Sequence, residues 1–238
     1  MNRSEIPSLV LLPPLFIFAV SMGFLEAIVV VYIRELFYPE GFAFPLKPME
    51  TWLIGTEMVR ELCTLLMLWA VASISGRSFI RRLAAFLFLF GIWDIFYYVA
   101  LWIFLGWPQS LLTWDILFLI PVTWTGPVLA PVLCSLTMIL LAVLLERQQM
   151  KYGIKAPGKK TLILFITGSI LIMVAFMYDF SILIVEGNYL SQFFSLAENT
   201  AFLQEMMLYV PDRFQWEIFS AGLLIILTGI FPLLKKRG

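Results

Sequence analysis

The composition of this chain is that of an integral membrane protein. Of its 238 residues, 61% are hydrophobic and 13% are charged, whereas a soluble domain is about 45–50% apolar and about 25% charged. Sixteen basic residues balance sixteen acidic ones and histidine is absent, so nucleic-acid binding has no support and histidine-ligated metals, haem and histidine-dependent nucleophiles are excluded.

Six apolar runs are long enough to cross a bilayer, which takes about 20 residues at about 1.5 Å per residue. The first begins at a Pro-Pro pair, which is tolerated in the first turn of a helix. The first three predicted spans cover residues 13–36, 51–75 and 83–105.

Residues 111–145 form an apolar run that is too long for one span, and prolines interrupt it. The stretch "TWTGP" is typical of a helix start, with Thr125 as the cap and Pro127 in the first turn. We therefore predict a short interfacial or re-entrant segment over residues 111–121 and a fourth span over residues 125–146.

Two further spans are predicted over residues 161–185 and 214–234. Between them, residues 194–210 carry apolar side chains at helical spacing, which predicts an amphipathic helix lying flat on the outer surface. The predicted fold is therefore all-α: a polytopic membrane helix bundle of six transmembrane helices that forms a single integral-membrane domain over residues 1–238.

Basic residues gather on one side of this six-span arrangement. They flank the second and fourth connections and end the chain, Arg3 precedes the first span on the same side, and the exceptions are Arg34, Lys47, Arg60 and Arg213. Because lysine and arginine are retained on the cytoplasmic side, we expect both termini in the cytoplasm and the protein in a prokaryotic plasma (inner) membrane. Most acids then lie in the spans or the outer loops.

Acidic side chains lie deep inside three of the predicted spans. At about 1.5 Å per residue from the outer end, Glu26, Glu61 and Asp94 lie about 15–16 Å deep, and Arg60 lies about 13 Å deep. An ionised acid at the bilayer centre costs about 2.5–3.5 kcal/mol. These groups must therefore face one another, water or a ligand.

Helical spacing gathers polar neighbours around these acids. Glu57, Arg60 and Glu61 share one stripe of the second span, and Tyr97 and Tyr98 share a face with Asp94 in the third. Gly23 lies one turn before Glu26, where small residues allow helices to approach closely. The predicted ligand- or ion-binding residues are Glu26, Glu57, Glu61, Asp94, Tyr97, Tyr98 and, lining an entrance in the fifth span, Asp179.

Two interpretations of the buried charges remain. Arg60, together with Arg34, forms a structural ion-pair network that fixes the helix register, or the acids form a functional site. One or two arginines cannot neutralise four acids, which favours protonated or cation-bound carboxylates.

A weak internal repeat accompanies these charges. "GFLE" (23–26) and "GIWD" (91–94) each place an acid three residues after a glycine, and each is followed by an aromatic-proline pair and a further acid, Glu50 or Asp115. Hairpin repeats of this kind occur in transporters.

Three functions fit the sequence. The first is a protein that binds or transports a proton, a cation or a cationic small molecule at a buried acidic site open to the extracytoplasmic side. The second is an intramembrane enzyme on a lipid or isoprenoid substrate, with Glu26 and Asp94 as acid–base groups. The third is an accessory subunit of a larger membrane complex. No catalytic residue is assigned, no metal or other cofactor is expected, and the expected partners are the lipid bilayer and a small cation or cationic ligand.

Overall fold

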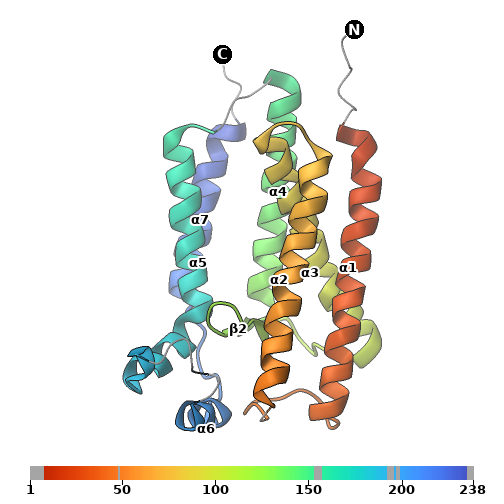
Figure 1. Cartoon of the computed structure of the whole chain (residues 1–238). Helices are drawn as coiled ribbons and strands as arrows, with labels where there is room; N and C mark the ends of the chain where they lie inside the picture. The colour runs from red at the N-terminus through yellow and green to blue at the C-terminus, as the bar shows by residue number, and fades with distance from the viewer. Residues whose placement is uncertain (1–7, 48, 153–156, 192–195, 197–198, 235–238) are drawn as a thin grey trace.

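The computed structural model describes residues 8–47, 49–152, 157–191, 196 and 199–234. These residues form an upright bundle of helices with one two-stranded hairpin (Figure 1). The elements are α1 (Ser8–Phe37), α2 (Thr51–Ser75), α3 (Phe79–Leu105), β1 (Trp114–Phe118), β2 (Trp124–Pro127), α4 (Leu129–Tyr152), α5 (Lys159–Glu186), α6 (Thr200–Leu208) and α7 (Trp216–Leu234).

The all-α prediction is confirmed, and five of the described helices, α1 to α5, are long and apolar enough to cross a membrane. The helix at the position of the predicted sixth span, α7, is apolar but shorter. It packs along α5 with its chain direction reversed (Figure 1). That α7 makes a sixth crossing stays a prediction.

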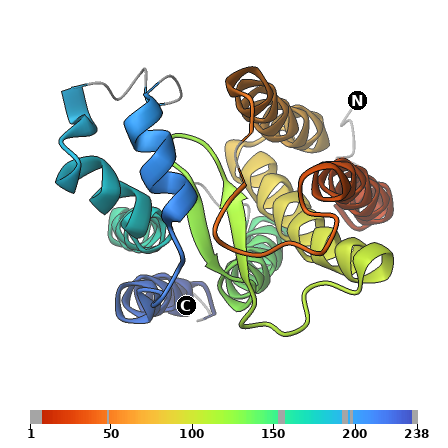
Figure 2. The same cartoon turned by 90° about the horizontal axis from the view of Figure 1, so that it is seen from below.

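The helices form two groups with the hairpin between them. α1 and α2 pack on α3, and α3 packs on α4. The α5–α7 pair joins this group through α4 and β2, and Figure 2 shows the hairpin lying between the two groups when the bundle is seen from below. Buried apolar side chains fill both groups, such as Leu68 and Leu89 in the first and Phe176 and Phe219 in the second.

The two ends of the bundle differ in what they carry. One end, which we call the hairpin end, holds the α1–α2 connection, the β1–β2 hairpin and α6 (Figure 1). The opposite end holds the start of α1 and the end of α7, together with the α2–α3 turn. The N-terminal end of α1 and the C-terminal end of α7 therefore lie on the same side of the bundle.

The short interfacial or re-entrant segment predicted over residues 111–121 contains the strand β1 (Trp114–Phe118). β1 pairs antiparallel with β2, and Thr125 lies in β2 opposite Ile116. The prediction that Thr125 caps the fourth helix is therefore wrong, and α4 begins at Leu129. Aromatic and β-branched residues favour a strand here, and cross-strand hydrogen bonds satisfy the backbone where prolines prevent a helix.

The predicted amphipathic helix over residues 194–210 is present in shorter form. α6 covers Thr200–Leu208, and the Asn199 side chain caps it by accepting hydrogen bonds from the backbone N–H groups of Ala201 and Phe202. Most of the earlier part of the predicted range lies outside the described residues. α6 lies across the bundle axis at the hairpin end (Figures 1 and 2).

Candidate functional site

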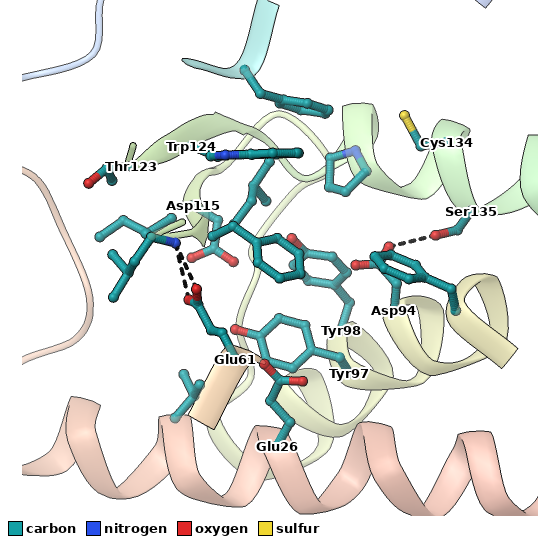
Figure 3. A pocket seen from close by; sticks show the side chains of 18 of the residues that line it. Glu26, Glu61, Asp94, Tyr97, Tyr98, Asp115, Thr123, Trp124, Cys134 and Ser135 are labelled. Carbon is teal, nitrogen blue, oxygen red and sulfur yellow. Dashed lines mark hydrogen bonds between the residues drawn. The ribbon is translucent and has the colours of Figure 1, made fainter. Parts of the chain in front are cut away.

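A cavity of about 450 Å³ lies between the two helix groups and reaches under the hairpin (Figure 3). Its walls come from α1, α2, α3, α4, α5, α7 and the hairpin. Six of the predicted ligand- or ion-binding residues line it, as do both predicted ion-pair residues, Arg34 and Arg60. The six are Glu26, Glu57, Glu61, Asp94, Tyr97 and Tyr98.

Arg60 joins two of the acids. Its Nη1 donates to Oε1 of Glu26 in α1 at 2.8 Å, and its Nε donates to Oε2 of Glu57 on its own helix at 2.7 Å. The guanidinium is largely buried, with 22% of the side chain exposed. Charge-assisted bonds of this kind are the strong ones in a medium of low dielectric constant. Arg60 therefore hydrogen-bonds to two carboxylates and ties α1 to α2, although its single positive charge offsets only one of them.

Glu61 and Asp94 have polar partners of a different kind. The backbone N–H of Leu119 donates to both oxygens of Glu61, at 3.2 and 3.0 Å, and the Ser135 hydroxyl donates to Oδ2 of Asp94 at 2.7 Å (Figure 3). Within the described part of the chain, neither carboxylate has a lysine or arginine within salt-bridge distance. These two acids are therefore the ones in the cavity that no arginine contacts directly.

The second arginine pairs with a residue outside the predicted site. Nη2 of Arg34 lies 3.0 Å from Oδ1 of Asp115 on β1, and the two residues are 6% and 1% exposed. The guanidinium also lies over the rings of Trp107 and Phe42, 3.8 and 4.5 Å from their centroids, so cation–π attraction adds to the ion pair. Arg34 therefore ties α1 to the hairpin.

Asp115 is the main residue that the sequence-based site omitted. The weak repeat had singled it out as an acid following an aromatic-proline pair, but its place in a supposed interfacial segment gave no reason to bring it next to α1. In the structure, Asp115 lies on β1 opposite Gly126 of β2, and its side chain lines the cavity.

The cavity lining contains more acidic than basic side chains. Five carboxylates line it, against the basic side chains of Lys47, Arg34 and Arg60. In addition, two carboxylate oxygens, Oε2 of Glu26 and Oδ2 of Asp115, are buried without a hydrogen-bond partner of ordinary geometry among the described residues. The carboxylates in the lining are Glu26, Glu57, Glu61, Asp94 and Asp115.

Polarity is divided along the length of the cavity. The charged residues lie on the halves of the helices nearer the hairpin end, where the exposed Lys47 also belongs to the lining. Farther from that end the lining is mostly apolar, with Leu87, Leu141, Phe165 and Ile226 among its members, and its polar groups are hydroxyls such as that of Ser169. The cavity is thus polar toward the hairpin end and hydrocarbon-like toward the other.

Two tyrosines outside the long helices support the hairpin end. The Tyr38 hydroxyl accepts a hydrogen bond from the backbone N–H of Lys47 at 2.8 Å, and burial raises the pKa of this phenol. Tyr209, just after α6, donates to Oδ2 of Asp179, and burial and this carboxylate raise the pKa of the Tyr209 phenol. Asp179 therefore anchors the segment after α6 and, unlike the other predicted site residues, is not in the cavity lining.

The chemistry open to the site follows from its side chains. Carboxylates accept hydrogen bonds and attract cations, and tyrosine hydroxyls donate as well as accept. Among the described residues, no three histidine, cysteine, aspartate or glutamate side chains group as a metal site would require. A fold alone does not define a function, so the assignment of a function depends on the residues of the site.

No protein-family model matches the chain, and neither a curated protein nor a solved structure matches it.

Proposed function

We propose that this protein resides in a prokaryotic inner membrane with both termini in the cytoplasm, and that it binds and transports a proton, a cation or a cationic small molecule. The ligand occupies the acidic cavity and enters from the extracytoplasmic side, which corresponds to the hairpin end. One observation supports this proposal above the others. Five carboxylates line the cavity against three basic side chains, and Glu61 and Asp94 have no basic partner among the described residues.

The energetic cost of these acids is the physical basis of the proposal. A charge taken out of water costs several kcal/mol unless another charge or a hydrogen bond compensates for it. Arg60 pairs with both Glu26 and Glu57, one positive charge against two carboxylates, and Arg34 pairs with Asp115. A positively charged ligand supplies the missing compensation for the remaining acids, so binding stabilises the folded protein.

The experiment is thermal unfolding of the protein in lipid nanodiscs across a series of cations and pH values. A ligand that binds only the folded state at 100 times its dissociation constant stabilises it by about 2.7 kcal/mol. We expect Asp94→Asn and Glu61→Gln to fold, because each amide keeps the size of the acid and can accept a hydrogen bond. Both variants should lose the cation- or pH-dependent stabilisation.

Glu217→Gln is the matched control. Glu217 lies at the start of α7, exposed and paired with Arg213, and it is not in the cavity lining. Its response to cations should equal that of the wild type. If Asp94→Asn and Glu61→Gln also keep the full response, the acidic cavity is not the binding site and the proposal fails.

A further inference from the structure

We infer that the ligand of this cavity is an amphiphilic primary amine: a cationic –NH₃⁺ head joined to an apolar chain. The inference rests on the proposed function, for which it names the class of ligand. Three features of the cavity support it, namely the unsatisfied carboxylate oxygens, the aromatic walls and the apolar limb.

Two buried carboxylate oxygens, Oε2 of Glu26 and Oδ2 of Asp115, would be satisfied by a ligand that has both a positive charge and hydrogen-bond donors. Arg60 engages Oε1 of Glu26 and Arg34 engages Oδ1 of Asp115, while the second oxygen of each carboxylate is buried without an ordinary partner. The Tyr98 phenol lies near Asp115 and the Trp93 indole lies near Glu26, but neither completes a hydrogen bond of ordinary geometry. Buried polar atoms are almost always hydrogen-bonded in folded proteins. An ammonium group carries three N–H donors and no acceptor, which suits these oxygens.

The walls beside these acids are aromatic. Phe118 on the hairpin lies between Trp93 and Trp124, with ring centroids 6.3 and 5.6 Å away. Trp124 stacks on Phe176 of α5, with centroids 5.8 Å apart and planes at 15°. All four rings line the cavity, and Figure 3 shows the phenol rings of Tyr97 and Tyr98 beside the carboxylates. Ring faces attract organic cations, so these walls suit a cationic head.

The apolar limb of the cavity suits a chain on that head. Leu87 precedes Asp94 by two turns of α3, which places it about 10 Å farther from the hairpin end. Leu141, Phe165, Ile172 and Ile226 continue this lining from α4, α5 and α7. A small inorganic ion would leave these walls without contacts, whereas a hydrocarbon chain buries its surface against them.

The test compares three probes on the protein in nanodiscs: methylammonium, n-octylammonium and n-octanol. We expect n-octylammonium to raise the unfolding temperature at concentrations at least tenfold below those that methylammonium requires. We expect n-octanol to give no shift, because it lacks the charge. Octyltrimethylammonium, which has the charge and the chain but no N–H donor, should act more weakly than n-octylammonium.

A pair of neighbouring substitutions in α5 tests the apolar limb. Ser169 lines the cavity, and Ser169→Trp should occupy the limb, abolishing the advantage of n-octylammonium while keeping the response to methylammonium. Ile170 is 53% exposed and is not in the lining. The Ile170→Trp variant should therefore bind both amines as the wild type does. If the advantage of n-octylammonium came only from its partition into lipid, the two tryptophan variants would respond alike.

The outcomes separate this inference from the proposed function. Equal effective concentrations of the two amines, an equal shift with n-octanol, or equal potency of octyltrimethylammonium would overturn the amphiphilic primary amine and leave cation binding intact. Both proposals fail if no cation and no pH change stabilises the wild type. They also fail if Asp94→Asn and Glu61→Gln keep the full stabilisation. The probe comparison uses the wild-type protein alone, so it remains decisive even if Ser169→Trp does not fold.

Discussion

Arg60 pairs with acidic side chains of two neighbouring helices, α1 and α2. It holds Glu26 and Glu57 through two charge-assisted hydrogen bonds, one of them to a different helix. We expect this pair to fix how α1 and α2 sit relative to each other, as the structural interpretation of the buried charges predicts. The remaining acids, Glu61 and Asp94, have no such partner among the described residues.

We predict that Arg60→Leu destabilises the protein severely. Removing one partner of a buried ion pair leaves the other charge uncompensated, which typically costs about 3–5 kcal/mol. The measurement is the yield of folded protein and its thermal unfolding in detergent or nanodiscs.

Arg213→Leu is the control for this change. Arg213, just before α7, and Glu217 form an exposed pair four residues apart, and exposed pairs contribute little to stability. This variant should match the wild type. Equal yields and equal unfolding temperatures for Arg60→Leu and Arg213→Leu would show that Arg60 does not hold the acids together.

Between elements, close helix approach depends on glycine. An added Cβ at Gly23 in α1 would lie 2.7 Å from the carbonyl oxygen of Trp93 and 2.9 Å from the backbone nitrogen of Tyr97, both in α3. Because these neighbours are backbone atoms, they cannot move without shifting the helix. The prediction that Gly23 marks a close helix contact beside Glu26 is confirmed by this geometry.

Gly23→Ala should therefore destabilise the bundle by about 1–3 kcal/mol, the usual cost of overpacking. The matched control is Gly55→Ala in α2, where an added Cβ meets no atom within 4 Å. Since alanine favours a helix over glycine by about 1 kcal/mol, Gly55→Ala should be neutral or stabilising. Thermal unfolding of both variants gives the answer, and Gly23→Ala at or above the stability of Gly55→Ala would refute the close contact.

The hairpin contacts both helix groups and forms part of the cavity wall. Leu119, just after β1, donates to Glu61 of α2, and Asp115 of β1 pairs with Arg34 of α1. β2 packs on α5. The prolines and the length of the run indicate an interruption here, but they do not indicate the contacts that the hairpin makes with three distant helices.

For the whole molecule, the arrangement of helices and the placement of the basic residues together predict the outcome of topology mapping. Reporter fusions after Gly76, Gly153 and Gly238 should report the cytoplasm. Fusions after Gly41 and Asn188 should report the outer side, because alternate connections lie at opposite ends of a bundle of crossing helices. An outer-side signal at Gly238 would show that α7 does not cross, and a cytoplasmic signal at Gly41 would invert the orientation.

The sequence by itself determines which segments are apolar helices and how deep their charges lie. Runs of about 20 apolar residues have no stable alternative in lipid, and a rise of about 1.5 Å per residue places Glu26, Arg60 and Glu61 at one level. That level is where Arg60 contacts Glu26. These conclusions depend only on distance along each helix.

The tertiary structure alone decides which side chains meet. Arg34 and Asp115 are 81 residues apart, Glu61 and Leu119 are 58 apart, and Asp94 and Ser135 are 41 apart. Each contact requires a particular rotation of a helix about its axis and a particular return of the hairpin. Packing of many small contacts sets both, and because that packing sums over neighbours distant in sequence, it leaves no signature in any single stretch of the chain.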